Sequence, residues 1–294
     1  MIFIGFSNNR VLNEHLNKIS KHFKTAPIGN VRTSTIMYLT DLLKARAFYK
    51  KKLFIYNTSP TNLLTTILSK LFFSKVIFHL HDPKPHSGAF NPIIYLTQMI
   101  QLIFSDYVVV FDNKLVNDTL SYYPLIPKKT IKVFNHGRPT FKIIPTTINP
   151  SKVNFGFFGR NMPYKGLNEF IKLAKNTPKS LFYVCGSGYE SEAENNNLDN
   201  LIFINRYIEN NEYYSILRQM DYVVVPYKNI SYSGVIIDCI SLGKEILVSQ
   251  EVSDAFNYPN MTLISELNSP SKQPLKNSKS LGWNSYAKSL KTLI

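Results

Sequence analysis

The sequence contains little cysteine and none of the patterns in which cysteine carries structure or metal. Only two cysteines occur in 294 residues, and Cys185 and Cys239 both lie inside apolar segments, without the spacing of metal ligands. A disulfide framework is therefore excluded, and we interpret both cysteines as reduced core residues of a cytoplasmic protein.

Long apolar runs are also missing. No stretch of 18 residues is free of charged or polar interruption, and the opening segment MIFIGFSNNR has no basic stretch ahead of an apolar one. We therefore expect neither a membrane span nor a secretory signal. With 44% hydrophobic and 18% charged residues, the chain is typical of a globular protein, and its length favours two domains.

Acidic residues are scarce in the first half of the chain. Residues 1–150 hold 19 Lys and Arg against 6 Asp and Glu, a net +13, whereas residues 151–294 hold 15 against 13, a net +2. A basic surface attracts nucleic acid or an anionic membrane. The recurring Lys, Asn and Ile offer an alternative explanation in genome composition, and no RNP, KH, zinc-finger or helix-turn-helix signature supports nucleic acid.

Apolar and basic residues mix in residues 36–52, IMYLTDLLKARAFYKKK. Such a stretch is able to lie on a membrane with its cations among anionic headgroups. The alternative is a core-facing helix with a solvated basic end. We expect a cytoplasmic protein, with peripheral attachment to the inner face of the plasma membrane as an open alternative.

Short runs rich in Val, Ile, Phe and Tyr alternate along the chain with stretches of helical spacing. The runs cover residues 2–6, 53–56, 76–80, 107–111, 131–134, 153–158, 181–185, 201–204, 222–226, 245–249 and 262–264. Strand alternating with helix predicts an α/β fold with parallel sheets covered on both faces. Residues 138–150 contain three prolines and no periodicity, so we interpret them as a linker between two doubly wound domains, 1–148 and 149–272. Such a pair of domains predicts a ligand crevice between the carboxyl ends of both sheets.

The segment NFGFFGRNMPYKG, residues 154–166, carries two cations where a strand gives way to a helix. Gly159 is suited to a tight turn, and Arg160 and Lys165 follow it. Two cations beside a helix N-terminus favour a diphosphate, because the free N–H groups and the helix dipole attract the same negative charge. The alternative is a solvated Arg and Lys at an ordinary turn.

Two later segments contain turns suited to a bound ligand. In YVCGSG, Gly186 and Ser187 follow a strand, and the glycines allow the backbone to approach a ligand closely, although such a turn is also common without one. Further along, Ser233 and Gly234 begin a helix on which Asp238 lies one turn later. With phosphate at the Ser233 and Gly234 amides, Asp238 would accept hydrogen bonds from ribose hydroxyls; the alternative is a solvated or capped helix carboxylate.

In the first half, FHLHDPKPHSG delivers His79, His81, Asp82 and His86 into a proline-rich loop. The prolines interrupt helical ligand geometry and no HExxH or Cys/His pattern is present, so we expect no metal site. We assign the loop to an acceptor, whose hydroxyl His81 or Asp82 would orient or deprotonate. The alternative is that the histidines only brace the loop.

Taken in order, these segments resemble the group 1, family 4-like glycosyltransferases of the GT-B fold. The resemblance covers about two thirds of the chain and rests on KVFNHGRPTF, FFGRNMPYKG, YVCGSG, DYVVVPY, SGVIIDCISLGKEILVS and LGWNSYAKSL. It implies two Rossmann-like domains facing a central crevice, an acceptor-side domain followed by a nucleotide-sugar domain. It also implies that the closing helix, in residues 273–294, packs back on the first domain.

The resemblance also implies site roles. Arg160 and Lys165 would bind the diphosphate of the donor, helped by the amides of Ser233, Gly234 and Val235, and Asp238 would take the place of the family's ribose-binding Glu. Gly5, at the end of the first strand, would let its loop approach the donor phosphate. Ile230 stands where the family usually has a second Glu near the sugar hydroxyls.

These observations lead to a functional hypothesis. No Asp-x-Asp pair occurs in the chain, so the fixed cations are expected to stabilise the leaving diphosphate without a metal. We expect a hexosyltransferase that uses a nucleoside-diphosphate sugar as donor and no cofactor. Its acceptor would be a glycan or a polyisoprenoid-linked sugar in cell-surface polysaccharide synthesis. The alternatives are a nucleotide-sugar epimerase of the same architecture, or a non-catalytic protein that binds nucleotide sugar or nucleic acid.

Overall fold

The structure is a computed structural model of the whole chain. It describes residues 43, 53–57, 67, 70–71, 74–80, 83, 91–134, 141–228, 230, 233–256, 258, 260–273 and 283–293. The chain divides into two compact units: unit 1 comprises Met1–Pro139 and Leu281–Ile294, and unit 2 comprises Thr140–Ser280. The expected strand at residues 2–6 and the basic segment 36–52, apart from Leu43, lie outside the described residues.

Unit 1 contains a parallel sheet with the strand order β1-β2-β3-β4. Its strands are β1 (Leu53–Asn57), β2 (Lys75–His79), β3 (Tyr107–Val110) and β4 (Ile131–Val133). Consecutive residues of β2 and β3 are buried, as expected for strands covered on both faces. These residues are apolar apart from His79, which explains why the strands were visible in the sequence as continuous runs.

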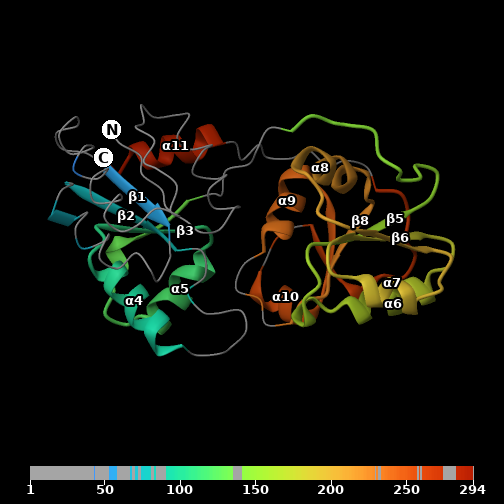
Figure 1. Ribbon diagram of the computed structural model, residues 1–294, viewed down its shortest axis with the longest axis horizontal. Helices are drawn as coiled ribbons and strands as arrows, with labels where there is room; N and C mark the ends of the chain where they lie inside the picture. The colour runs from blue at the N-terminus through green and yellow to red at the C-terminus, as the bar shows by residue number, and fades with distance from the viewer. Residues whose placement is uncertain are drawn as a thin grey trace. The chain divides into compact units, whose positions relative to one another are not determined.

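Helices cover both faces of this sheet (Figure 1). They are α4 (Pro92–Ile103), α5 (Asn113–Tyr122) and α11 (Trp283–Lys291), with the 3-10 turn η2 (Lys128–Thr130) before β4. Helix α11 comes from the end of the chain, and its apolar residues pack with Ile77 of β2, Val109 of β3 and Phe134. The hydroxyl of Tyr286 on α11 lies 2.8 Å from Nε2 of the buried His79. His79 is therefore part of the packing between β2 and α11.

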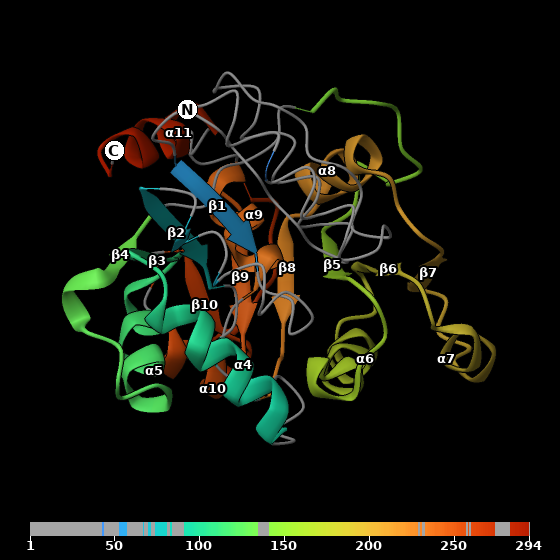
Figure 2. The same cartoon turned by 60° about the vertical axis from the view of Figure 1, so that its left-hand side comes forward.

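Unit 2 contains a larger parallel sheet with the strand order β10-β9-β8-β5-β6-β7 (Figure 2). Its strands are β5 (Asn154–Phe158), β6 (Leu181–Gly186), β7 (Leu201–Asn205), β8 (Tyr222–Val225), β9 (Glu245–Val248) and β10 (Met261–Leu263). Strands β6 and β7 follow β5 on one side of it, and β8, β9 and β10 follow in turn on its other side. The reversal between β5 and β8 is the point at which open α/β sheets bind ligands, at the carboxyl ends of the strands.

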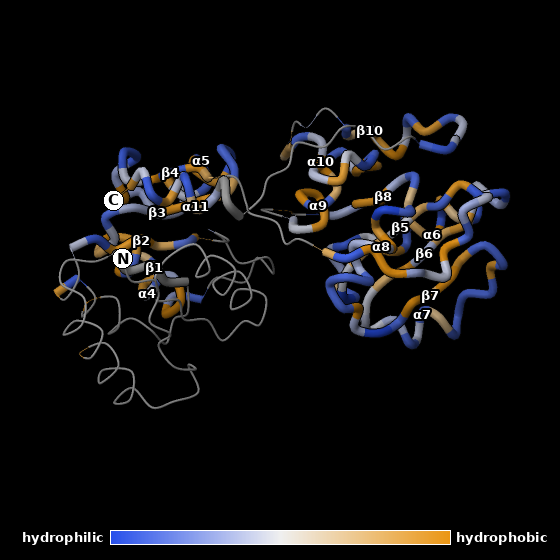
Figure 3. The backbone as a smooth tube through the Cα atoms, turned by 90° about the horizontal axis from the view of Figure 1, so that it is seen from above, coloured by the Kyte–Doolittle hydropathy of each residue, from blue (hydrophilic) through white to orange (hydrophobic). Residues whose placement is uncertain are grey.

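Two hydrophobic clusters fill the two faces of this sheet. The helices are α6 (Leu167–Asn176), α7 (Glu190–Asn195), α8 (Asn210–Gln219), α9 (Gly234–Leu242) and α10 (Gln250–Ala255), with the 3-10 turns η3 (Pro163–Lys165) and η4 (Ile264–Glu266). Helix α6 packs on one face, where Phe170 meets Phe155 and Phe182 of the strands. Helices α8 and α9 pack on the other, around Phe158 and Val223. In Figure 3 the outer loops of unit 2 are mainly hydrophilic, as this layering requires.

The α/β fold with parallel sheets expected from the sequence is confirmed. None of the helices in the described ranges has the length and apolar character that crossing a lipid bilayer requires.

The segment that enters unit 2, residues 141–148, has neither helix nor strand and lies along α8. The amide of Lys142 donates to Oδ1 of Asn211 at 3.0 Å, and that of Ile144 donates to Oγ of Ser215 at 2.9 Å. Ile148 is buried in the unit 2 core. These contacts explain why unit 2 begins at residue 140, whereas the sequence placed the boundary at 148.

The segment that leaves unit 2 is also bonded to it. The buried carboxylate of Asp221 accepts hydrogen bonds from the amides of Asn154 and Gln273 and pairs with Lys272 at 3.1 Å. Residues up to 273 therefore belong with unit 2, and the division falls at residue 280 rather than at the expected 272.

Candidate functional site

The turn after β5 brings a lysine amine over the end of the strand. Gly159 has φ = 110°, and a Cβ atom at this position would overlap the amine of Lys165. Lys165 lies at the end of η3, and its Nζ donates to the carbonyl oxygen of Phe158 at 3.3 Å. Gly166, with φ = 71°, is the N-cap of α6. From the sequence we expected Lys165 to begin this helix, but Lys165 lies in the short 3-10 turn before it.

The pKa of Lys165 is lowered in the folded protein. This pKa falls from 10.5 to about 8, mainly because of burial and in addition because of the nearby positive charge of Arg160. The amine lies 5.6 Å from the centre of the Tyr227 ring, a distance that allows a cation–π contact. Arg160 itself is exposed. The two cations predicted from the sequence thus lie close enough to repel each other, which favours an anion between or beside them.

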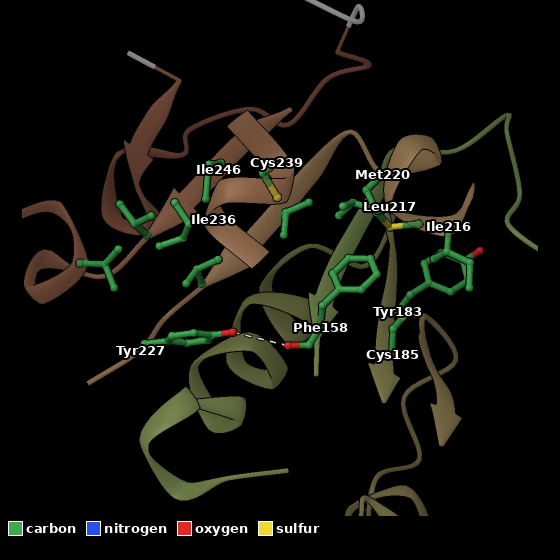
Figure 4. Close-up of a cluster of buried hydrophobic side chains, with 14 of the residues drawn as sticks. Phe158, Tyr183, Cys185, Ile216, Leu217, Met220, Tyr227, Ile236, Cys239 and Ile246 are labelled. Carbon is green, nitrogen blue, oxygen red and sulfur yellow. Dashed lines mark hydrogen bonds between the residues drawn. The ribbon is translucent and has the colours of Figure 1, made fainter. Parts of the chain in front are cut away.

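Tyr227 connects Lys165 to the start of α9. Its hydroxyl donates to the carbonyl oxygen of Phe158 at 3.5 Å (Figure 4). The same oxygen accepts a hydrogen bond from Lys165. Burial raises the pKa of this phenol, and a hydrogen bond from the Ser233 side chain opposes the rise. The lysine amine and the cap of α9 therefore both contact one buried tyrosine.

The start of α9 has the form expected from the sequence. Ser233 is the N-cap, with its Oγ accepting from the amide of Ile236 at 3.4 Å. The first amides of an α-helix, here those of Gly234 and Val235, have no partner within the helix. Among the residues that the structure describes, no heavy atom lies within 4 Å of the place where a Gly234 Cβ would stand, apart from the chain neighbours and the helix itself. Such a helix N-terminus favours an anion.

The turns after β5 and β6 are bound to each other. A Cβ atom on Gly186 would overlap the carbonyl oxygen of Gly159, and the amide of Asn161 donates to the carbonyl oxygen of Ser187 at 2.9 Å. The hydroxyl of Tyr189 donates to that same Gly159 oxygen at 2.8 Å. The YVCGSG turn therefore shapes the loop that carries Arg160 and Lys165, a packing role that a GxG pattern alone did not reveal.

Asp238 has partners that the sequence did not predict. Its Oδ2 accepts a hydrogen bond from the hydroxyl of Tyr213 and its Oδ1 one from that of Tyr214, both at 3.0 Å. The tyrosines lie on α8, 25 and 24 residues earlier in the chain. These two hydrogen bonds hold both carboxylate oxygens.

The structure thus gathers most of the predicted donor residues at the carboxyl edge of the unit 2 sheet. Lys165, Gly186 and Ser233 follow β5, β6 and β8, and Asp238 lies one helical turn beyond Gly234. On the acceptor side, Gly5, His81 and Asp82 lie outside the described residues, so their roles stay predictions.

Solved structures match this chain over most of its length. Sucrose-phosphate synthase from Thermosynechococcus elongatus superposes with a TM-score of 0.61 and 13% identity, over 88% of this chain and 68% of that one. The lipopolysaccharide outer core galactosyltransferase WaaB superposes at 0.54 and 12%, over 100% and 89%. The chain has the GT-B fold. No protein-family model and no curated protein sequence matches it.

The GT-B fold is shared by enzymes with different reactions. UDP-GlcNAc 2-epimerase from Methanocaldococcus jannaschii superposes with a TM-score of 0.60 and 11% identity, over 99% of this chain and 98% of that one. At such identities the likeness is one of fold, so the reaction of this GT-B chain has to be argued from its own residues.

Proposed function

We propose that this GT-B chain is a metal-independent hexosyltransferase, which moves a sugar from a nucleoside-diphosphate sugar to a glycan or lipid-linked acceptor in cell-surface polysaccharide synthesis. The observation that carries this proposal is the position of Lys165. Its amine has a pKa lowered to about 8 and lies beside the Tyr227 ring, whose hydroxyl is hydrogen-bonded to Ser233, the N-cap of α9. The names of the sucrose-phosphate synthase and galactosyltransferase structures that share the fold also support sugar transfer.

The proposed chemistry is electrostatic. As the bond between the sugar and the diphosphate breaks, negative charge grows on the diphosphate. The ammonium of Lys165, the guanidinium of Arg160 and the first amides of α9 would stabilise that charge without a metal ion. The backbone at Gly186 and Ser187 would border the phosphates, and Asp238 would accept hydrogen bonds from the ribose hydroxyls. The acceptor hydroxyl would be oriented or deprotonated by His81 or Asp82, with Gly5 near the phosphate.

A surface helix of unit 1 supports an acceptor held at a membrane. Helix α4 has no charged residue, and it buries the polar Thr97 and Gln101 while Ile93, Leu96 and Ile103 are 73%, 51% and 48% exposed. Leu102 is buried with Thr97 and Gln101, so the helix buries both polar and apolar residues and still exposes a group of apolar ones. An apolar helix face on a strongly basic half of the chain fits the interface of an anionic bilayer, and we propose peripheral attachment there.

The direct test is to incubate the protein with a panel of radiolabelled nucleotide sugars, with and without a lipid extract, and to measure nucleoside diphosphate release and labelled product. We expect release that depends on the acceptor, persists in EDTA and falls by roughly 100-fold or more in Lys165→Met, in line with the loss of one transition-state donor. If no donor released its nucleoside diphosphate in any of these combinations, the proposal would be contradicted.

A nucleotide-sugar epimerase is the second candidate, because the epimerase structure matches this chain over nearly the full length of both. The same panel separates the two. Epimerisation changes the donor sugar without an acceptor and retains the nucleotide bond in the product, whereas transfer requires an acceptor and releases the nucleoside diphosphate. Tight binding of a nucleotide sugar with neither outcome would favour a non-catalytic binding protein.

A further inference from the structure

Asp238 is held by two neighbouring residues of one helix. In an α-helix, consecutive side chains diverge by about 100°. Tyr213 and Tyr214 therefore approach the carboxylate from different sides, with ring centres 5.0 Å apart and ring planes 81° apart. Each hydroxyl donates to a different carboxylate oxygen at 3.0 Å. Two such donors fix both the position and the rotation of the carboxylate.

Tyr213 also contacts Phe158, the residue whose carbonyl oxygen is bound by Lys165. Its ring packs edge-on against Phe158, at 5.4 Å between centres, and the Phe158 carbonyl oxygen accepts from Lys165. Burial raises the pKa of Tyr213 well above its usual value, and the charge of Asp238 adds to the rise. The phenol therefore stays protonated and remains a donor throughout the physiological range.

Tyr214 is held in turn by the segment that enters unit 2. The ring of Phe141 stacks on the buried ring of Tyr214, with centres 4.7 Å apart and planes 16° apart. Beyond Phe141, the hydrogen bonds from Lys142 and Ile144 to α8 fix this segment along the helix. One face of α8 thus receives the incoming chain, and its tyrosines reach Asp238.

We infer that Tyr213 and Tyr214 are positioning residues that set Asp238 for the cis-hydroxyls of a nucleoside ribose, and that Phe141 acts on Asp238 through Tyr214. The inference rests on the proposed function, because it takes Asp238 as the ribose acceptor. It adds the tyrosine pair and the incoming segment to the residues that decide nucleotide affinity.

The experiment compares two ligands on each variant by calorimetry. UDP, ADP and GDP are screened on the wild type, and the one bound most tightly is paired with its 2′,3′-dideoxy form. The readout is the ratio of the two affinities, because a general loss of structure lowers both affinities together, whereas a misplaced Asp238 weakens only the ribose contacts.

We expect the wild type to prefer the ribonucleotide and Asp238→Asn to lose most of this preference. Tyr213→Phe and Tyr214→Phe should each reduce it by roughly tenfold while leaving the dideoxy affinity unchanged, because each loses a hydrogen bond to a charged group. The matched control is Tyr183→Phe. Tyr183 is buried in the same core, and its hydroxyl accepts from the amide of Asn149 at 3.3 Å. This variant should keep the full preference.

Phe141→Leu should reduce the preference by roughly threefold, and should reduce it no further in a Tyr214→Phe background, since the hydroxyl through which Phe141 acts is then missing. Full ribonucleotide preference in both tyrosine variants would overturn the inference and leave the proposed function standing. A wild type that binds none of the three nucleoside diphosphates would overturn the proposed function and this inference together.

Discussion

Gly186 lies directly against the carbonyl oxygen of Gly159, so that a Cβ atom at position 186 would overlap that oxygen. Gly186 also has φ = 153°, a backbone conformation that residues with a side chain rarely adopt. The same oxygen accepts a hydrogen bond from Tyr189. The turn after β6 therefore sets the path of the turn that carries Arg160 and Lys165.

The first prediction concerns this contact. Gly186→Ala introduces both the overlap and an unfavourable φ, so we expect it to lower the free energy of unfolding by about 2 kcal/mol or more. It should also weaken nucleoside diphosphate binding, because the loop of Lys165 has to move. Chemical denaturation and calorimetry on the same samples measure the two effects.

Gly234→Ala is the matched control for this prediction. Within the described part of the chain, a Cβ atom there would meet no heavy atom within 4 Å outside the local helix, and Gly234 is the first residue of α9. Its stability should equal or slightly exceed that of the wild type, because alanine is the better helix former. Equal stability of Gly186→Ala and Gly234→Ala would show that the close approach of Gly186 to Gly159 is unimportant.

The strands of both sheets could be predicted from the sequence, because a parallel strand buried on both faces needs an unbroken apolar run. The run at residues 153–158 became β5, in which all five residues are buried, and residues 107–111 contain β3. The path of residues 141–148 could not be predicted. Their contacts with α8 are hydrogen bonds from backbone amides to Asn211 and Ser215 and the stacking of Phe141 on Tyr214, none of which leaves a periodic pattern.

In the candidate site, the local features could be predicted and the long-range ones could not. Ser233 was visible as an N-cap because capping depends on residues within one helical turn. The tyrosine partners of Asp238 come from a different helix, and nothing in the spacing of α8 distinguishes Tyr213 and Tyr214 from ordinary core residues. The link from Lys165 through Tyr227 to Ser233 likewise appears only once β5 and β8 pair.

The second prediction is that Lys165→Met stabilises the fold while it weakens diphosphate binding. The pKa of Lys165 falls from 10.5 to about 8 on folding, so the unfolded chain binds more protons between these pH values. The free energy of unfolding of the wild type should therefore rise with pH across this window, relative to the variant. The advantage of Lys165→Met should be largest at pH 7 and shrink towards pH 10, as measured by urea unfolding at several pH values.

Lys244 provides the control for the binding part of this prediction. It is buried, burial lowers its pKa to about 8 as well, and its Nζ donates to the carbonyl oxygen of Met220 at 2.8 Å. It precedes β9 and so lies at the amino end of that strand, away from the candidate site. Lys244→Met should leave nucleoside diphosphate affinity unchanged. If Lys244→Met lost as much affinity as Lys165→Met, the loss would come from removing a buried lysine from the fold, and Lys165 would not be assigned to the diphosphate.

The third prediction concerns proton uptake on binding. At pH 8 about half of the Lys165 side chains are neutral, and a bound diphosphate favours the ammonium, so binding should take up about half a proton. Calorimetry in two buffers with different ionisation enthalpies measures this number. Affinity should fall as the pH rises above 8, and the uptake should vanish in Lys165→Met and persist in Lys244→Met. If Lys165→Met took up as many protons on binding as the wild type, the group that gains the proton would be a residue other than Lys165.

The fourth prediction tests the surface of α4. Ile93, Leu96 and Ile103 are exposed on a helix without charge, and burying them in a bilayer interface would remove their apolar area from water. We expect the wild type to sediment with anionic vesicles, less so with added salt and hardly at all with neutral vesicles. Leu96→Glu should reduce the bound fraction several-fold by placing a charge in the apolar face.

Ile202→Glu is the matched change on unit 2, because Ile202 is also an exposed apolar residue and lies on β7, outside α4. It adds the same charge to the whole protein, so it reproduces any general electrostatic effect on vesicle binding. Binding that falls in Leu96→Glu and not in Ile202→Glu would place the contact on α4. An equal fall in both variants would leave only the overall positive charge to attract the vesicles, and no binding to anionic vesicles at low salt would favour an acceptor that is free in solution.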